Sequence, residues 1–189
     1  GEMVAYEPVE MVVDPALNLL DYLVAPPLVG DTLRVQAQEL AKQTVESFGT
    51  NGLFGVELFV TDDGNLLVNE VAPRAHNSGH HTIEACVTSQ FENQLRACLD
   101  LPLGVVELRG VALTANLVGE SGLIGSPVIE GLEDLLQLPD AHIHLYGKDE
   151  CRPGRKMGHF TLIGNNHDEL IQQLESVRRS LVVRGDTPQ

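Results

Sequence analysis

The sequence predicts an α+β fold whose sheets are mostly antiparallel, and three features support this class. Residues 31–48 repeat apolar side chains at the three-to-four spacing of an amphipathic helix. Residues 53–60 and 66–71 are two apolar runs joined by the turn-forming sequence Thr-Asp-Asp-Gly-Asn. From about residue 105 onward, short strand-like segments alternate with turns. Together these patterns indicate helices combined with sheets that are built from hairpins.

The first expected elements are strand segments followed by one helix. Residues 2–13 read as one or two strands with no element before them, so we expect the chain to be a fragment. A helix is predicted from Asp31 to Phe48, with Asp31 as its N-cap and Gly49 as its C-terminal stop. Its apolar face would contain Leu33, Ala37, Leu40, Ala41, Val45 and Phe48.

The middle of the chain predicts a hairpin, an irregular stretch and a second helix. Strands Leu53–Val60 and Leu66–Val71 are expected to pair across Asp63-Gly64, because Asp-Gly between apolar runs is a strong hairpin signal. An irregular stretch from Ala72 to His81 follows. The sequence Ser89-Gln90-Phe91-Glu92 is a capping box, which predicts a helix from about Ser89 to Leu99.

The C-terminal part predicts short strands and a last helix. A short helix is expected near Glu133 and a longer one over residues 168–181, and the tail after Arg184 is expected to be loose. The strands are expected at residues 111–118, 141–146 and 157–163.

Composition and charge exclude several classes of function. The net charge of −15 disfavours nucleic acid and anionic membrane as partners, because such a surface repels polyanions at long range. No apolar run approaches the roughly 20 residues of a membrane-spanning helix, and the first ten residues lack a signal peptide pattern. The three widely spaced cysteines favour reduced thiols in a cytoplasmic protein.

The hairpin is expected to bring two glutamates together. A two-residue turn at Asp63-Gly64 pairs Val60 with Leu67 and Glu57 with Glu70, which places both carboxylates on one face of the sheet. Opposed like charges destabilise a sheet, so a cation such as Mg²⁺ would suit this position. The alternative is a solvated pair without function, and a register slip of one residue would separate the two side chains.

The loop after Glu70 is rich in groups that bind anions. Residues 73–81 contain Arg74, an amide, a hydroxyl and three histidines, and Gly79 permits close approach of another backbone. Such donors suit a phosphate, a carboxylate or a developing oxyanion. A zinc site that includes His76 and His80 is one alternative, and a purely structural loop is another.

A basic turn lies near the C-terminus. Lys148, Arg152, Arg155 and Lys156 fall within residues 146–159, and Arg152-Pro153-Gly154-Arg155 has the composition of a tight turn. A positive cluster in an acidic chain suggests a phosphate site, although a solvated hairpin loop explains it equally well.

Several of these motifs together resemble one enzyme family, N5-carboxyaminoimidazole ribonucleotide synthetase, also called the ATPase subunit of phosphoribosylaminoimidazole carboxylase. The resemblance runs from about Glu2 to about Ile163. The most specific strings are Asn69-Glu-Val-Ala-Pro-Arg74 and His76-Asn-Ser-Gly-His80, and they are supported by Ser89-Gln-Phe91, Arg96-Ala97, Leu101-Pro-Leu-Gly104, Tyr146-Gly-Lys148 and Arg155-Lys-Met-Gly-His159.

The resemblance implies an ATP-grasp ligase that uses ATP and bicarbonate to carboxylate 5-aminoimidazole ribonucleotide, through carboxyphosphate, in purine biosynthesis. It implies Mg²⁺, with Mn²⁺ as an alternative, bound by Glu57 and Glu70, and nucleotide beside Asn69 and Glu70. Arg74, His76 and Lys156 would be catalytic. The ribonucleotide substrate would be bound by Arg74, His76, Asn77, Ser78, Arg155 and Lys156.

The resemblance also implies an incomplete enzyme. The family is roughly twice as long as this chain, and its glycine-rich loop, nucleotide lysines and adenine hinge have no counterpart here. Residues 1–104 would be the C-terminal portion of an ATP-grasp domain with an antiparallel sheet, and residues 105–189 a small, mostly β domain with a terminal helix. We expect a homodimer that is inactive as this chain alone. A non-catalytic binding module and an ATP-independent hydrolase remain alternatives.

Overall fold

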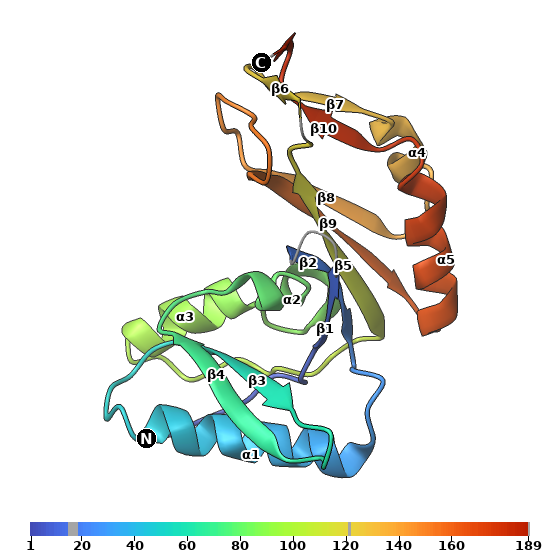
Figure 1. Ribbon diagram of the computed structural model, residues 1–189. Helices are drawn as coiled ribbons and strands as arrows, with labels where there is room; N and C mark the ends of the chain where they lie inside the picture. Colours follow the sequence, from blue (N-terminus) through green and yellow to red (C-terminus); the bar gives the residue numbers. More distant parts are fainter. Residues whose placement is uncertain (15–18, 121, 189) are drawn as a thin grey trace. The chain divides into compact units, whose positions relative to one another are not determined.

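The computed structural model describes residues 1–14, 19–120 and 122–188, and the chain forms two compact units (Figure 1). The first unit contains residues 1–10 and 24–109, and the second contains residues 11–23 and 110–189. The division therefore falls five residues after the expected boundary at 104. In addition, residues 11–23 belong with the C-terminal unit. The reason is that strand β1 (Glu10–Asp14) and strand β2 (Leu19–Ala25) lie at one edge of its sheet.

The first unit is built around helix α1 (Asp31–Glu46) and the two-stranded sheet of β3 (Gly55–Val60) and β4 (Leu66–Ala72). Figure 1 shows this hairpin lying along α1, whose contacts are made with β4. The helix is capped by Gly30 instead of Asp31, which lies in the first turn, where a carboxylate complements the helix dipole. Gly49 has φ +60, as expected for a helix stop.

The rest of the first unit carries the loop of interest and its support. The loop contains a 3-10 helix, η1 (Asn77–Gly79), and runs into a short helix, α2 (Thr82–Ala85). Helix α3 (Gln90–Cys98) follows, and the Ser89 hydroxyl caps it by accepting from the Glu92 N–H at 3.2 Å. The Glu92 side chain pairs with Arg96 one turn later, at 2.6 Å. The helix start predicted by the capping box is thus confirmed.

The second unit has a five-stranded sheet in the order β1-β2-β5-β9-β8. Strand β5 (Val111–Val118) pairs antiparallel with β9 (Lys156–Gly164), and β9 pairs antiparallel with β8 (Ala141–Leu145). Helix α5 (His167–Val177) packs on β5 and β9 (Figure 1). The buried side chains between helix and sheet include Leu113, Phe160, Leu162, Leu170 and Leu174. Burial of this apolar surface is the main stabilising contribution to the unit.

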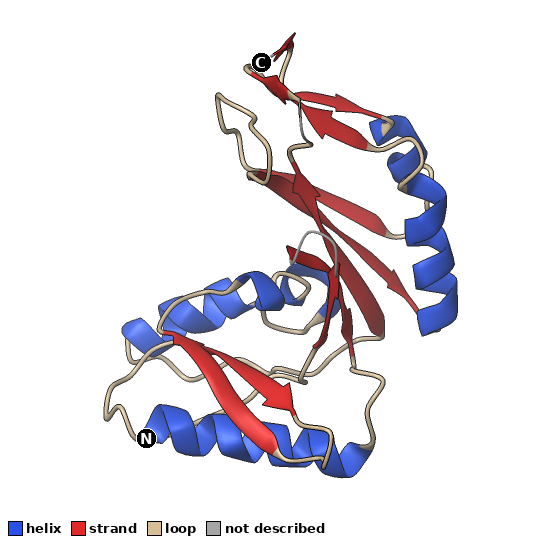
Figure 2. Cartoon of the chain, viewed as in Figure 1, coloured by secondary structure: helices blue, strands red, loops and turns tan. Residues whose placement is uncertain are grey.

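The C-terminal tail takes part in strands as far as Pro188, which corrects the expectation that it is loose. Strand β10 (Val182–Arg184) pairs with β7 (Val128–Glu130), and β11 (Thr187–Pro188) pairs with β6 (Leu123–Ile124). The Asp186 carboxylate also accepts from the Ser126 N–H at 3.0 Å. These pairings and the short helix α4 (Leu132–Leu136) complete the unit, whose helices and strands are distinguished in Figure 2.

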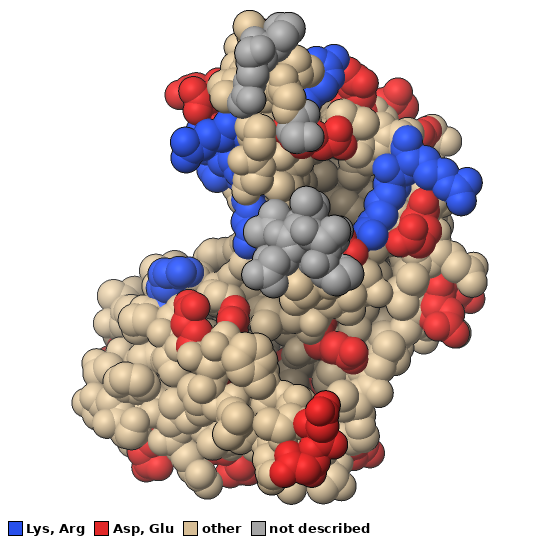
Figure 3. Space-filling view, in the orientation of Figure 1, with Lys and Arg blue, Asp and Glu red and all other residues tan. Residues whose placement is uncertain are grey.

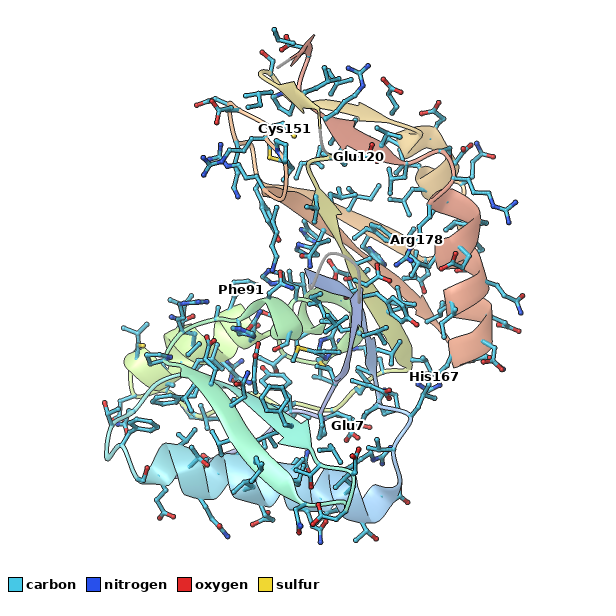
Figure 4. The ribbon with its side chains drawn as sticks, viewed as in Figure 1. Glu7, Phe91, Glu120, Cys151, His167 and Arg178 are labelled. Carbon is cyan, nitrogen blue, oxygen red and sulfur yellow. The ribbon has the colours of Figure 1, made fainter. Side chains whose placement is uncertain are left out.

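The N-terminal prediction is also partly wrong. Of residues 2–13, only those from Glu10 onward form a strand, and the segment Leu19–Ala25 forms a strand that the sequence pattern did not reveal. Asp21 of this second strand pairs with Arg178 at the end of α5, and Figure 4 labels the latter. Within the described part of the chain, no helix is long and apolar enough to span a membrane.

Candidate active site

Glu57 and Glu70 are direct partners in the β3–β4 hairpin, so their side chains leave the same face of the sheet. The register shifts by one residue between Glu57 and Leu58, and this bulge leaves Asn69 as the extra residue on β4. The Asn69 side chain reaches across the hairpin and donates from Nδ2 to Oε2 of Glu57 at 3.2 Å. The bulge thus gathers two carboxylates and one amide at a single position.

His76 lies against the same carboxylate from the loop side. Its Nε2 is 3.4 Å from Oε1 of Glu57, and the two side chains are only 14% and 22% exposed. On the other side of the ring, Nδ1 accepts from the Ser78 N–H at 3.3 Å and lies 2.8 Å from the Ser78 hydroxyl. Because Nδ1 accepts from a backbone N–H, the ring proton lies on Nε2, the nitrogen nearest to Glu57.

The loop that carries His76 is held by close contacts that need specific residues. The side-chain amide of Gln90 accepts from the His76 N–H at 3.0 Å and donates to the His76 carbonyl at 2.8 Å. A Cβ on Gly79 would lie 2.5 Å from Oε1 of Gln90, and a Cβ on Gly55 would lie 2.6 Å from Cβ of His76. Glycine at both positions therefore allows the loop to approach β3 and α3 closely.

The other loop residues predicted to bind substrate are placed as follows. Arg74 is exposed, and its Nη1 donates to the carbonyl of Ala75 at 2.9 Å. Asn77 and Ser78 begin the 3-10 helix, and His76 caps it. The structure therefore brings Ser78, His76, Glu57 and Asn69 into one connected set. Arg74 precedes His76 in the same loop and is not part of that set.

The two following histidines have structural contacts. His81 is buried, and its Nδ1 lies 3.1 Å from the Ser78 carbonyl, to which it donates. Burial lowers its pKa to about 4, so its ring is neutral at pH 7. His80 stacks on Phe91 with ring centroids 5.9 Å apart, and its Nδ1 lies 3.2 Å from Nε2 of Gln90. Both rings support the loop around Ser78 and Gln90.

The donor set at the hairpin fits a hard divalent cation. Two opposed carboxylates are the type of ligand that Mg²⁺ takes on its protein side, with phosphate oxygens and water on the other sides. Among the residues that the structure describes, no group of three or more His, Cys, Asp and Glu side chains is arranged to hold a metal alone. A closed zinc site at His76 and His80 is therefore not supported by the described residues, whereas a shared site with phosphate needs only the glutamate pair.

The predicted basic turn is present in the second unit. Gly154 has φ +73, and the Arg155 N–H donates to the Arg152 carbonyl at 3.0 Å, as in a type II turn. Arg155 contacts Glu150, with Nη1 3.7 Å from Oε1 and 2.8 Å from the carbonyl oxygen. Lys156 is exposed at the start of β9. Figure 3 shows that, on the visible face, Lys and Arg side chains are more frequent in the second unit than in the first.

Aromatic side chains support this turn. The Tyr146 hydroxyl lies 2.9 Å from Nδ1 of His159, and the ring of buried His159 stacks on His144 with centroids 4.6 Å apart. The ammonium of Lys148 lies 5.4 Å from the centroid of the Tyr146 ring. Burial raises the pKa of Tyr146, so its hydroxyl keeps its proton at neutral pH.

Sequence reasoning missed Gln90 as a residue of the site. Its side chain is buried and joins helix α3 to the loop fourteen residues earlier. The capping box located the helix start, but an amide in its first turn is commonly exposed. A signal was nevertheless present, because Gly79 and Gln90 both belong to strings that carried the family resemblance.

Two family models match the chain in sequence. Residues 1–91 match the ATP-grasp domain, and residues 112–173 match the phosphoribosylaminoimidazole carboxylase C-terminal domain. Among curated proteins, the N5-carboxyaminoimidazole ribonucleotide synthase of Mycobacterium tuberculosis is 47% identical over 156 residues, which are 81% of this chain and 36% of that protein. The phosphoribosylaminoimidazole carboxylase of Saccharomyces cerevisiae is 41% identical over 165 residues, or 85% of this chain and 28% of that protein.

Solved structures agree with these matches. The N5-carboxyaminoimidazole ribonucleotide synthetase of Thermotoga maritima superposes with a TM-score of 0.85 at 44% identity, over 87% of this chain and 46% of that one. The enzyme of Aspergillus clavatus, solved with ADP and 5-aminoimidazole ribonucleotide, gives a TM-score of 0.82 at 36% identity, over 92% of this chain and 46% of that one. The chain thus spans less than half of these relatives.

Proposed function

Because this chain belongs to the N5-carboxyaminoimidazole ribonucleotide synthetase family of ATP-grasp ligases, we propose that it supplies metal- and substrate-binding groups for ATP- and bicarbonate-dependent carboxylation of 5-aminoimidazole ribonucleotide. This reaction belongs to purine biosynthesis. The observation that carries the proposal is the contact of Asn69 and His76 with Glu57 at the hairpin bulge, where Glu70 is the strand partner of Glu57.

We assign the hairpin to the nucleotide side of the reaction. Glu57 and Glu70 would hold Mg²⁺, or Mn²⁺ in its place, against the phosphates of ATP, and Asn69 would lie beside the nucleotide. When bound, the metal lowers repulsion between the phosphates and an incoming anion such as bicarbonate. Related enzymes have been solved in complex with ADP, which supports nucleotide binding in this family.

We assign the loop to the ribonucleotide and the carboxyl group that it receives. Nε2 of His76 lies 3.4 Å from Oε1 of Glu57, so its N–H can also donate to a carboxyl group that gains negative charge beside this carboxylate. Arg74 provides an exposed cation in the same loop, and Asn77 and Ser78 provide amide and hydroxyl contacts. As the amine of the substrate forms its bond to the carboxyl carbon of carboxyphosphate, the bond from that carbon to the phosphate oxygen would break, and the inorganic phosphate that leaves would take up the amine proton.

We assign the basic turn of the second unit to the phosphate of the ribonucleotide. Lys156, which is exposed at the start of β9, is the main candidate by the family resemblance, and Arg155, which contacts Glu150, is the weaker one. A cytoplasmic location and a homodimeric state complete the proposal, and both rest on the family alone.

The first experiment measures binding by this chain. Isothermal titration with Mn²⁺ in the presence of excess ADP, whose phosphates would complete the coordination, should give one site; Glu70→Gln should weaken it at least about tenfold, whereas Asp62→Asn in the neighbouring turn should leave it unchanged. Unchanged Mn²⁺ affinity in Glu70→Gln would contradict the assignment of the metal ligands.

The second experiment measures the reaction. In the Thermotoga maritima enzyme, this chain would replace the matching segment, to which it is 44% identical. The chimera should release ADP only when bicarbonate and 5-aminoimidazole ribonucleotide are both present. Release of ADP that is independent of the ribonucleotide, from a chimera that binds it, would argue against a carboxylating ligase.

A further inference from the structure

We propose that Gln90 is a positioning residue, which holds His76 in the orientation that places Nε2 3.4 Å from Oε1 of Glu57. The inference deepens the proposed function, on which its catalytic meaning rests. It concerns a buried side chain on helix α3 that the assignment of metal and substrate groups does not include.

Gln90 contacts the backbone of His76 through both polar atoms of its side-chain amide. Its Oε1 accepts from the His76 N–H at 3.0 Å, and its Nε2 donates to the His76 carbonyl at 2.8 Å. Both backbone groups of one residue are therefore fixed by a single side chain. A neutral amide suits this role, because it carries a donor and an acceptor on the same carbon.

Gln90 is itself held in place by Thr82 of helix α2. Its backbone N–H donates to Oγ1 of Thr82 at 2.9 Å, and the same hydroxyl donates to the Gly79 carbonyl at 2.6 Å. Gly79 leaves the space that the amide occupies, because a Cβ there would lie 2.7 Å from Cδ of Gln90. The amide is thus confined by helix α3 on one side and by the loop on the other.

Fixing the backbone of His76 also limits its ring. Nδ1 accepts from the Ser78 N–H at 3.3 Å only while His76 keeps the extended conformation, φ −120 and ψ 152, that caps the 3-10 helix. With Nδ1 engaged, the proton stays on Nε2, 3.4 Å from Glu57. Gln90 therefore acts on Glu57 through His76, as a partner behind a ligand does in many metal sites.

The test compares Gln90→Met, which keeps the length of the side chain but removes the amide, with Gln94→Met on the same helix. The ring nitrogens of His76 are observed by ¹⁵N NMR in this chain at neutral pH, and Mn²⁺ affinity is measured by titration. We expect Gln90→Met to replace the single Nε2–H form by a mixture of both neutral forms, and Gln94→Met to leave it unchanged. Mn²⁺ affinity should fall about tenfold in Gln90→Met.

A double-mutant cycle shows whether the effect passes through His76. His76→Ala should weaken Mn²⁺ binding by a similar factor, and the double variant should be no weaker than His76→Ala alone. A purely structural role predicts additive losses and an unchanged ring form, and this result would overturn the proposal. If Gln90→Met does not fold, Gln90→Glu serves instead, since it keeps the acceptor and loses the donor.

The outcomes separate this inference from the proposed function. If the wild-type chain binds no Mn²⁺, the metal assignment fails, but the ring form of His76 still decides whether Gln90 positions it. If Mn²⁺ binds and the ring form does not depend on Gln90, the metal assignment stands and the positioning role is wrong.

Discussion

Glu57 lies opposite Glu70 only because the hairpin contains a bulge at Asn69. Near the turn, Val60 pairs with Leu66 across residues 61–65, and this register continued along the strands would place Glu57 opposite Asn69. The one-residue shift between Glu57 and Leu58 moves the pairing to Glu70 and leaves Asn69 to contact Glu57 with its side chain. The bulge is thus the local feature that builds the carboxylate pair.

Glu70 should lower the stability of the metal-free protein and raise its affinity for the metal. In the presence of EDTA, Glu70→Gln removes repulsion between opposed like charges and should stabilise the first unit by a few tenths of a kcal/mol. The same variant should bind Mn²⁺ at least about tenfold more weakly, which corresponds to about 1.4 kcal/mol. Chemical denaturation and titration check the two effects.

Asp62→Asn is the matched control for this prediction, because it removes one negative charge from the same hairpin without touching the pair. It should change neither quantity measurably. Loss of stability in metal-free Glu70→Gln would show that Glu70 has a structural contact instead of an unfavourable one.

Close packing of the loop on β3 should make Gly55 sensitive to any side chain. In Gly55→Ala, the new Cβ would lie 2.6 Å from Cβ of His76, so either the strand or the loop must move. We expect a loss of about 1–3 kcal/mol in the free energy of unfolding, as for overpacked cores. Weaker Mn²⁺ binding should accompany it, because His76 moves away from Glu57.

Gly30→Ala provides the comparison for Gly55→Ala. A Cβ on Gly30 meets no atom within 4 Å, so its effect should be small, as measured by thermal unfolding. Equal losses in the two variants would mean that the contact with His76 does not govern the result.

The sequence predicted the main elements because their patterns are local. Helix α1, the hairpin strands, helix α3 and strands β5, β8 and β9 were all placed within a few residues. The tail and the strand Leu19–Ala25 were missed, because each depends on distant partners: β10 pairs with β7, and β2 lies in a sheet with β5. Short strands of this kind carry little periodic signal of their own.

The pairing of Glu57 with Glu70 was predicted correctly, but the strand register used to predict it is wrong near the turn. A two-residue turn at Asp63-Gly64 was expected, whereas the Thr61 N–H donates to the Asn65 carbonyl at 2.9 Å around a three-residue loop. The Thr61 hydroxyl accepts from the Asn65 N–H at 3.0 Å, which supports the longer loop. The bulge shifts the register by one residue and so restores the expected pairing of Glu57 with Glu70. Neither the longer loop nor the bulge can be predicted from the Asp-Gly signal alone.

Burial of neutral His81 should make the stability of the first unit depend on pH. Its pKa is about 4 in the folded state and about 6.5 when unfolded, so the unfolded state binds more protons between these values. Stability contributed by His81 is therefore intact above about pH 6.5 and is lost progressively as the pH falls toward 4. The full loss is about 3 kcal/mol, at about 1.4 kcal/mol per pKa unit.

His81→Asn should flatten this dependence, because an amide can donate to the Ser78 carbonyl but does not titrate. Urea unfolding followed through the backbone amide signals of the first unit, at pH 4.5 and pH 7.5, measures the difference. The same slope in both proteins would assign the pH dependence to other groups.

Lys156 should contribute more to ribonucleotide binding than Arg155, although Arg155 is the better phosphate ligand in general. Arg155 already pairs with Glu150, with 3.7 Å between Nη1 and Oε1, so binding phosphate would require it to leave a carboxylate. Lys156→Ala should weaken binding of 5-aminoimidazole ribonucleotide about tenfold and Arg155→Ala by less, as measured by titration at low salt.

Arg179→Ala, which removes an exposed cation elsewhere in the second unit, should have no effect. Because the contact is between charges, the loss in Lys156→Ala should shrink as salt is raised. A loss in Arg179→Ala as large as that in Lys156→Ala would instead mean that general charge attraction, and not the basic turn, holds the phosphate.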